Sequence, residues 1–101
     1  MNNCDQVINI LKQHNEVLKT RFGLSGLVLY GSYAKGSQRA ESDLDLLYEV
    51  PEGNHIPLMR LQKMQEYIGT LLGVSKVEAV NRKYINPVVF KDIQQYAITI
   101  F

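Results

Sequence analysis

Residues 27–50 have the sequence LVLYGSYAKGSQRAESDLDLLYEV, in which two apolar runs enclose a polar segment. The first run, 27–30, is typical of a short buried strand. The pair Gly31–Ser32 follows it directly and predicts a turn of the kind that glycine permits. Residues 33–36 leave room for only about one or two turns of helix. The stretch therefore predicts a strand that ends in a tight turn and a short helix.

The second apolar run, 43–50, predicts another strand. Its start alternates, so Asp43 and Asp45 share one face, about 7 Å apart, while Leu44 and Leu46 share the other. Repulsion between the two carboxylates is about 2.4 kcal/mol at an effective dielectric near 20. A divalent cation would relieve it, and Mg²⁺ is commonly held by one or two carboxylates together with substrate phosphates. Acid pairs of this spacing also occur on exposed strands and at turns, so the pair alone leaves both interpretations open.

The Gly31–Ser32 pair is equally ambiguous when it is taken alone. Gly31 can simply supply a positive φ angle, and Ser32 can cap the short helix. The same pair can present backbone N–H groups and a hydroxyl at a helix N-terminus, which suits a phosphate. A phosphate cradle and an acid pair at the ends of adjacent strands favour a functional site over two unrelated local features.

The remaining chain predicts further helices and strands by its apolar spacing. The last residues, 97–101, fit either a frayed helix or a short strand. Apolar residues at three- and four-residue steps make the helix after Pro57 the clearest one, and we expect its stripe, Met59 and Met64 included, to lie in the core. In the last helix we expect Val89, Phe90, Ile93 and Ala97 to face inward. The predicted elements are a helix over 5–22 ended by Gly23, a turn over 51–54, a helix over 57–72 ended by Gly73, a strand over 76–80, and a helix that starts at Asn86–Pro87.

Length and composition limit the possible functions. A chain of 101 residues is predicted to be a single domain, 1–101. Its 11 Lys and Arg against 10 Asp and Glu give a net charge of +1, without the cationic field that duplex DNA binding requires. No apolar run approaches a membrane span and no signal peptide is evident, so we expect a cytoplasmic protein that does not enter membranes. The single cysteine, Cys4, excludes an internal disulfide and a multi-cysteine zinc site.

Several polar or aromatic residues have no partner spacing that indicates chemistry. His14 and His55 are expected at the surface or its boundary, and Cys4 is expected to be incidental. Arg82 and Lys83 follow the predicted strand 76–80 and are expected in a solvated loop. Tyr33 could line a pocket or pack into the core.

Taken together, Gly31–Ser32, Asp43-x-Asp45 and the following Leu46–Leu47 resemble the signature of the DNA-polymerase-β-like nucleotidyltransferase superfamily. The length and layout resemble its minimal nucleotidyltransferases, the MNT antitoxin family, over nearly the whole chain. The resemblance implies an α/β (α+β) fold with a small mixed sheet and helices packed on one side. It also implies an enzyme that transfers AMP from ATP and releases pyrophosphate.

The resemblance further implies a role for each motif residue. Gly31 and Ser32 would hold the terminal phosphates of a nucleoside triphosphate, with Lys35 as a further nucleotide-binding residue. The catalytic carboxylates Asp43, Asp45 and Glu78 would bind Mg²⁺, expected as two ions, and Glu78 would help to deprotonate an acceptor hydroxyl. Two departures stand out: Glu78 replaces the more frequent Asp, and Lys35 stands where Arg is common, so that a bidentate contact becomes a point charge.

The family also implies a partner. A chain of 101 residues has no separate acceptor-binding domain, so the expected acceptor is a tyrosine hydroxyl of a small helical HEPN-type toxin, which the chain would neutralise as an antitoxin. RNA would be met only through that partner. The alternative is a binding module of the same fold, weakly active or inactive, that neutralises its partner by contact or senses nucleotide.

Overall fold

The computed structural model describes residues 3–39 and 41–101, which form helices on both sides of a small sheet. The predicted order of elements is confirmed except that the first helix is divided in two, and the structure adds a 3-10 turn, η1. The elements are α1 (Cys4–Gln13), α2 (Asn15–Phe22), β1 (Gly26–Tyr30), α3 (Gly31–Lys35), β2 (Leu44–Glu49), α4 (Leu58–Leu72), β3 (Val77–Asn81), η1 (Arg82–Tyr84), α5 (Pro87–Ile93) and β4 (Ile98–Thr99).

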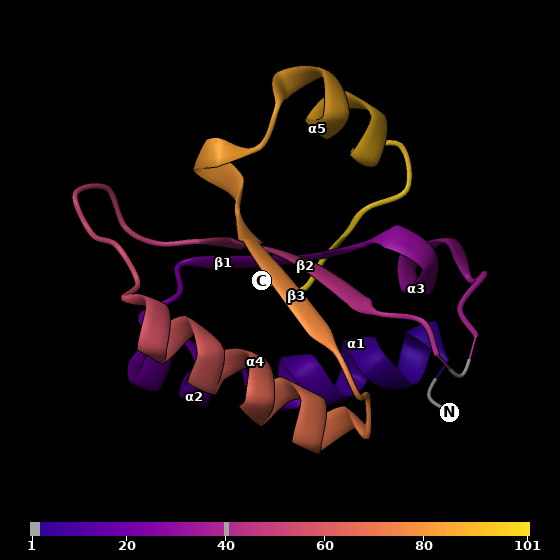
Figure 1. Cartoon of the computed structure of the whole chain (residues 1–101), viewed down its shortest axis with the longest axis horizontal. Coiled ribbons are helices and arrows are strands. Elements are labelled where there is room, and N and C mark those ends of the chain that lie inside the picture. The colour runs from indigo at the N-terminus through magenta and orange to yellow at the C-terminus, as the bar shows by residue number, and fades with distance from the viewer. Residues whose placement is uncertain (1–2, 40) are drawn as a thin grey trace.

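The sheet is mixed, with the strand order β3-β2-β1-β4. Strand β1 runs antiparallel to β2 and to β4, whereas β2 and β3 are parallel. Parallel neighbours need a long crossover connection, and α4 supplies it (Figure 1). The crossover brings the start of β3 beside the start of β2, where the acid pair lies.

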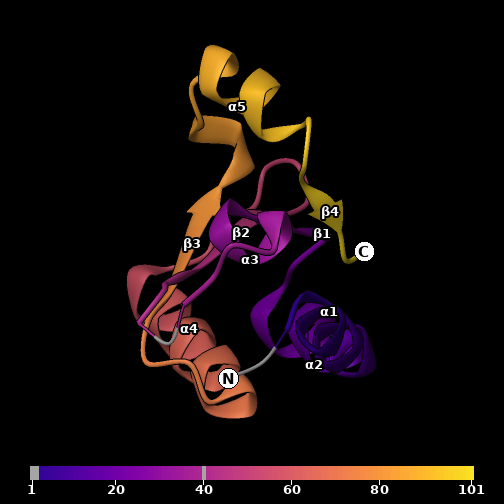
Figure 2. The ribbon, with the colours of Figure 1, turned by 90° about the vertical axis from the view of Figure 1, so that its right-hand side faces the viewer.

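Helices α1, α2 and α4 cover one face of the sheet (Figures 1 and 2). Strand alternation turns Leu27, Leu29, Leu44 and Leu46 towards them, and all four are fully buried at 0% exposure. Burying such a side chain stabilises the fold by about 1.5–3 kcal/mol. None of the helices among residues 3–39 and 41–101 is long and apolar enough to cross a membrane. The predicted α/β fold with a mixed sheet is confirmed. The expectation that all helices pack on one side is wrong, because α5 lies on the other side of the sheet.

Helix α5 lies over the opposite face of the sheet (Figures 1 and 2). On this face Leu47 of β2 is fully buried, and Ile93 of α5 is 4% exposed, although neither belongs to the main core. The inward orientation predicted for Ile93 is confirmed. The prediction for Val89 is wrong, since this side chain is 48% exposed. Only one side of the short helix α5 can meet the sheet.

The helix predicted over 5–22 is divided at His14. Helix α1 starts with a capping box between Asn3 and Gln6, and His14 ends it with φ −101° and ψ 17°. Nδ1 of His14 lies 3.0 Å from the Tyr67 hydroxyl of α4. The prediction of a single helix is therefore wrong at His14. The break coincides with the contact between His14 and α4, and apolar periodicity within one helix cannot reveal such a contact. The expectation that His14 lies at the surface boundary is confirmed, since it is half-buried.

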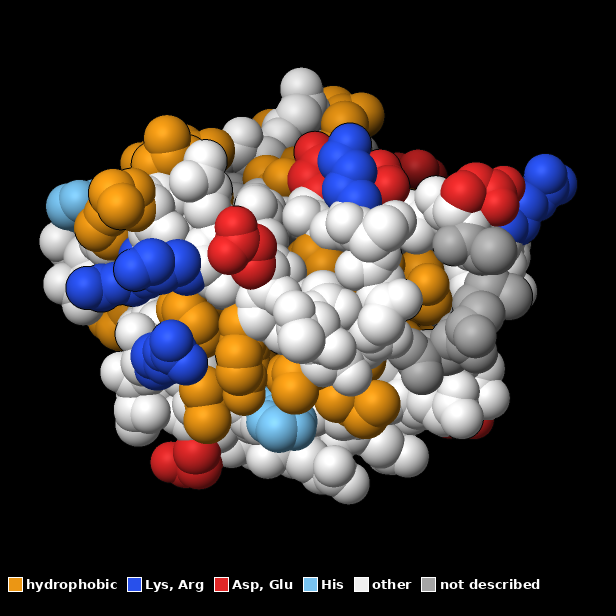
Figure 3. Space-filling view, turned by 60° about the horizontal axis from the view of Figure 1, so that its bottom comes forward, with side chains coloured by type: hydrophobic (Ala, Val, Ile, Leu, Met, Phe, Trp, Pro, Cys, Tyr) orange, Lys and Arg blue, Asp and Glu red, His pale blue; other side chains and the backbone are white. Residues whose placement is uncertain are grey.

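The helix predicted after Pro57 is confirmed, although Pro57 is its N-cap and not its first residue. Met64 is fully buried as expected, but Leu58 and Met59 are each 70% exposed. Their assignment to the core is wrong because the first turn of α4 lies before the part of the helix that packs on the sheet. Met59 instead borders a shallow pocket with Arg21, Arg60 and Lys63. Figure 3 shows basic and hydrophobic side chains side by side on this helical face.

The choice left open for residues 97–101 is settled in favour of a strand. Ile98 and Thr99 form β4 and pair with Leu29 and Val28 of β1. This pairing makes β4 the edge of the sheet next to β1. The segment that connects α5 to β4 passes close to α3, so Tyr96 in this segment lies near the predicted site.

Candidate active site

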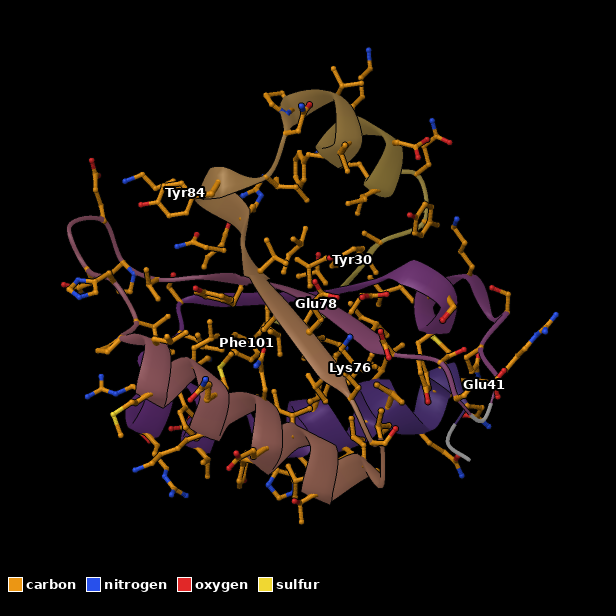
Figure 4. The ribbon with its side chains drawn as sticks, in the orientation of Figure 1. Tyr30, Glu41, Lys76, Glu78, Tyr84 and Phe101 are labelled. Carbon is orange, nitrogen blue, oxygen red and sulfur yellow. The ribbon has the colours of Figure 1, made fainter. Side chains whose placement is uncertain are left out.

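Three polar side chains form one row across β1, β2 and β3, at the end of β1 and near the starts of β2 and β3. Tyr30 of β1 pairs with Asp45 of β2, and Asp45 pairs with Glu78 of β3. Residues paired in this way turn their side chains to the same face, about 5 Å from one strand to the next. Figure 4 shows Tyr30 and Glu78 on the face that α5 partly covers. The parallel pairing of β2 and β3 thus places Glu78 directly beside Asp45.

Gly31 directly follows Tyr30 and lies against the Asp45 side chain of this row. It has φ +75°, which favours glycine, and the strand passes through it directly into α3. A Cβ atom at this position would overlap Oδ2 of Asp45 and lie 3.0 Å from its Cβ. The backbone of the glycine turn therefore packs against the second carboxylate of the acid pair. Ser32 is the second residue of α3 rather than its N-cap, so the capping role considered for it is not observed.

Asp43 lies one residue before β2 and has a different environment from Asp45. Its Oδ2 is 3.6 Å from Nζ of Lys76, a surface ion pair in which both side chains are largely accessible. No motif marks this cation in the sequence, because Lys76 is simply the residue before β3. Its position follows from the same parallel pairing that brings Glu78 to Asp45. Lys76 thus compensates one carboxylate of the acid pair.

The charges of the row are only partly compensated. Partial burial raises the pKa of Asp45 above its ordinary value, the neighbouring carboxylates of Glu78 and Asp43 raise it further, and Lys76 lowers it. Burial, Asp45, Glu78 and Tyr96 together raise the pKa of Tyr30 to about 12. The Tyr30 phenol is therefore a neutral hydrogen-bond donor at physiological pH, whereas Asp45 carries a charge that a nearby cation would stabilise.

The three predicted metal ligands are brought to one end of the sheet, but they are not gathered into a finished metal site. Among residues 3–39 and 41–101, no group of three or more His, Cys, Asp or Glu side chains is arranged to hold a metal ion. The donor chemistry of Asp43, Asp45 and Glu78 nevertheless suits Mg²⁺, which binds oxygen and is usually completed by substrate phosphates and water. Burial and the neighbouring carboxylates raise the pKa of Asp45, so its ionised form is not fully compensated in the metal-free protein.

The other predicted nucleotide-binding residue, Lys35, is the last residue of α3. Its Nζ lies over the ring of Tyr96, 4.4 Å from the ring centre. Tyr96 was not predicted as a site residue because it lies outside every motif, in the segment between α5 and β4. Tyr33, for which two roles were open, is 2% exposed and packs in the core.

A hollow lies at the far ends of β2 and β3 from this row. It is a pocket of about 600 Å³ lined by residues that include Glu49, Arg82, Lys83 and Phe90. Arg82 and Lys83 are exposed as expected, although they belong to the 3-10 turn η1 and not to an irregular loop. The Arg82 guanidinium pairs with the Glu49 carboxylate and lies 4.5 Å from the centre of the Phe90 ring. His55 also borders this pocket and is exposed, as expected.

The sequence of this chain is similar to those of known proteins. Residues 11–100 match the family described as Nucleotidyltransferase domain. A candidate protein adenylyltransferase of Methanocaldococcus jannaschii is 34% identical over 96 residues, which cover 94% of this chain and 95% of that protein. The protein adenylyltransferase MntA of Thermococcus cleftensis is 30% identical over 90 residues, which cover 88% of this chain and 87% of that protein.

Solved structures share the fold. A candidate minimal nucleotidyltransferase superimposes with a TM-score of 0.74 at 27% identity, covering 96% of this chain and 95% of that one. A tri-AMPylated HEPN toxin in complex with an MNT antitoxin, from Shewanella oneidensis, gives a TM-score of 0.66 at 13% identity. That match covers 97% of this chain and 71% of the other, and at such identity the likeness shows the fold alone.

Proposed function

Since the chain belongs to the nucleotidyltransferase domain family, we propose that it is a protein adenylyltransferase that transfers AMP from ATP to a hydroxyl group of an acceptor protein. The predicted membership of the minimal nucleotidyltransferases is confirmed by the family match and by the solved structure of the same size. The observation that carries the proposed activity is the packing of the glycine turn against Asp45 with Glu78 in register beside it. This arrangement joins a phosphate cradle to a row of carboxylates.

In the proposed reaction, the backbone N–H groups and hydroxyl at Gly31 and Ser32 bind the terminal phosphates of ATP. Asp43, Asp45 and Glu78 would hold Mg²⁺, expected as two ions, which supplies charge stabilisation at the phosphates. Because Asp43 is paired with Lys76 in this structure, its carboxylate would exchange that ion pair for the cation. Lys35 contributes a point charge to the polyphosphate.

The chemical step forms one bond and breaks one bond at phosphorus. The acceptor hydroxyl oxygen bonds to the α-phosphorus while the bond from that phosphorus to the bridging oxygen breaks, and pyrophosphate leaves. The proton of the hydroxyl passes to the Glu78 carboxylate, which is exposed and therefore accessible to an acceptor. The chain contributes position and charge, and no covalent intermediate with the protein is needed.

The acceptor that we propose is a tyrosine hydroxyl of a small helical HEPN-type toxin, so that the chain acts as the antitoxin of the pair. Two relatives named for protein adenylyltransferase activity support a protein acceptor. The shared fold with the MNT antitoxin bound to a tri-AMPylated HEPN toxin supports the class of partner.

The experiment uses ATP labelled at the α-phosphate, with Mg²⁺, the pure protein and an extract of its native host, followed by separation of the proteins. A protein band labelled from α-labelled but not from γ-labelled ATP, and absent with Asp43→Asn/Asp45→Asn, would establish AMP transfer and identify the acceptor. A double variant that still neutralises its partner while transfer is absent would establish the contact-only alternative and reject the enzymatic proposal. Omission of Mg²⁺ should abolish the label.

A further inference from the structure

Tyr96 borders the site from a part of the chain that carries none of its motifs. The residue follows α5, where the Tyr96 N–H donates to the Ile93 carbonyl at 3.1 Å and the Ala97 N–H donates to the same carbonyl at 2.9 Å. Ile93 is buried, so this turn is fixed to the sheet through α5. The Tyr96 ring is half-buried and thus has a defined place beside α3.

Two observations place Tyr96 next to the nucleotide-binding motif. Its ring centre lies 4.4 Å from Nζ of Lys35. Its hydroxyl is also among the groups that raise the pKa of Tyr30, so it lies near the row formed by Tyr30, Asp45 and Glu78. The Tyr96 side chain therefore lies near both Tyr30, at the end of the row, and the ammonium of Lys35.

Lys35 itself lies one helical turn after the phosphate-binding pair. Residues three and four apart on a helix are neighbours, so Lys35 is on the same side of α3 as Ser32 and Gly31. Its side chain is exposed, and its flexible four-carbon stem would let the ammonium sample many positions in water. A cation attracted to the face of an aromatic ring loses much of that freedom.

We propose that Tyr96 is a positioning residue that holds the Lys35 ammonium near the Gly31–Ser32 turn, where it meets the polyphosphate of ATP. The inference rests on the proposed function, since it takes ATP as the ligand. It adds a residue from the C-terminal segment to a site otherwise formed by β1, α3, β2 and β3. The ring, rather than the hydroxyl, carries the role.

The test measures the Kd of ATP with Mg²⁺ by titration calorimetry for the full chain and its variants. Tyr96→Phe should bind as the wild type does, because the ring remains. Tyr96→Leu should raise Kd about two- to fivefold, as expected for the loss of an exposed cation–π contact. In a Lys35→Met background, Tyr96→Leu should add nothing further.

A second Lys–Tyr pair offers a matched control. Lys83 Nζ lies 5.9 Å from the ring centre of Tyr84, which is 76% exposed and borders the pocket at the far ends of β2 and β3. Tyr84→Leu should leave the Kd of ATP unchanged. An equal rise in Kd for Tyr84→Leu, or an effect of Tyr96→Leu that persists fully in the Lys35→Met background, would overturn the positioning role.

A readout without nucleotide keeps the two proposals separate. In the free protein, the ε-methylene protons of Lys35 should show an upfield ring-current shift by NMR that is retained in Tyr96→Phe and lost in Tyr96→Leu. Wild-type binding of ATP with no change of Kd in Tyr96→Leu would overturn the positioning role alone. Failure of the wild type to bind ATP would overturn both proposals, whatever the NMR spectra show of the contact.

Discussion

Gly31 and Asp45 are in direct contact, and the contact leaves no room for a side chain at residue 31. A Cβ atom there would overlap Asp45 Oδ2 and lie 3.0 Å from Asp45 Cβ. The positive φ of +75° separately favours glycine. One residue therefore meets two requirements, a backbone conformation and a close approach to the carboxylate.

This contact predicts that Gly31→Ala damages both stability and function. The positive φ costs about 1–3 kcal/mol for a residue with a Cβ, and Asp45 must also move away. We expect AMP transfer to fall at least tenfold. Gly23→Ala is the matched control, since Gly23 has φ +76° and nothing within 4 Å of an added Cβ. It should lose stability by the backbone cost alone and keep its transfer activity.

Urea unfolding and the labelled-ATP assay measure the two effects. If Gly31→Ala and Gly23→Ala lose equal stability and both retain wild-type transfer, the close contact with Asp45 has no functional consequence.

The two carboxylates of the acid pair should respond in opposite directions to neutralisation. Ionised Asp45 is opposed by burial and by Glu78 and Asp43, so Asp45→Asn should stabilise the metal-free protein at pH 7 by an amount on the order of 1 kcal/mol or less. Asp43 has the Lys76 ion pair, so Asp43→Asn should be neutral or destabilise by up to about 1 kcal/mol. Both variants should lose AMP transfer.

The pH dependence gives the sign of the Asp45 effect. Because the folded-state pKa of Asp45 lies above its ordinary value of 3.8, the fold favours the protonated carboxyl. Stability from this group is fully present below pH 3.8 and is lost as the pH rises through the folded-state pKa. The advantage of Asp45→Asn over the wild type should therefore shrink on acidification, as measured by urea unfolding in EDTA. An advantage that grows on acidification would show that the carboxylate is stabilised in the fold.

The glycine turn and the acid pair were predictable because each depends on neighbours in sequence. Alternation alone places Asp43 and Asp45 on one face of a strand. The partnership of Asp45 with Glu78 depended on a resemblance, because a parallel register is set by the α4 crossover and not by local pattern. Lys76 and Tyr96 were missed for the same reason, since only the tertiary fold brings them to the site.

The helix starting at Leu58 shows the other limit of pattern analysis. Periodicity identifies an apolar stripe but not where the packed part of a helix begins. Leu58 and Met59 should therefore tolerate polar replacement, with Leu58→Ser and Met59→Ser each within about 0.5 kcal/mol of the wild type. Met64 is the first fully buried residue of this helix, and Met64→Ala should lower the free energy of unfolding by about 2–5 kcal/mol. Chemical denaturation measures all three, and a large loss in Met59→Ser would show that the first turn is packed.

Glu78 is one of two residues that depart from the pattern implied by the resemblance, and its replacement tests the proposed proton acceptor. Glu78→Gln should lower the rate of AMP transfer about 100-fold or more, because the amide cannot take the hydroxyl proton. It should not lose stability, since it removes a like charge beside Asp45. Glu78→Asp keeps the carboxylate on a side chain that is one methylene shorter. Because the proton-accepting group is retained, the rate of AMP transfer should stay within about tenfold of the wild-type rate. The rates are compared at saturating ATP on the acceptor found by labelling. Wild-type rates in Glu78→Gln would remove Glu78 from the catalytic step, and the proton would then have to pass to another base or directly to water.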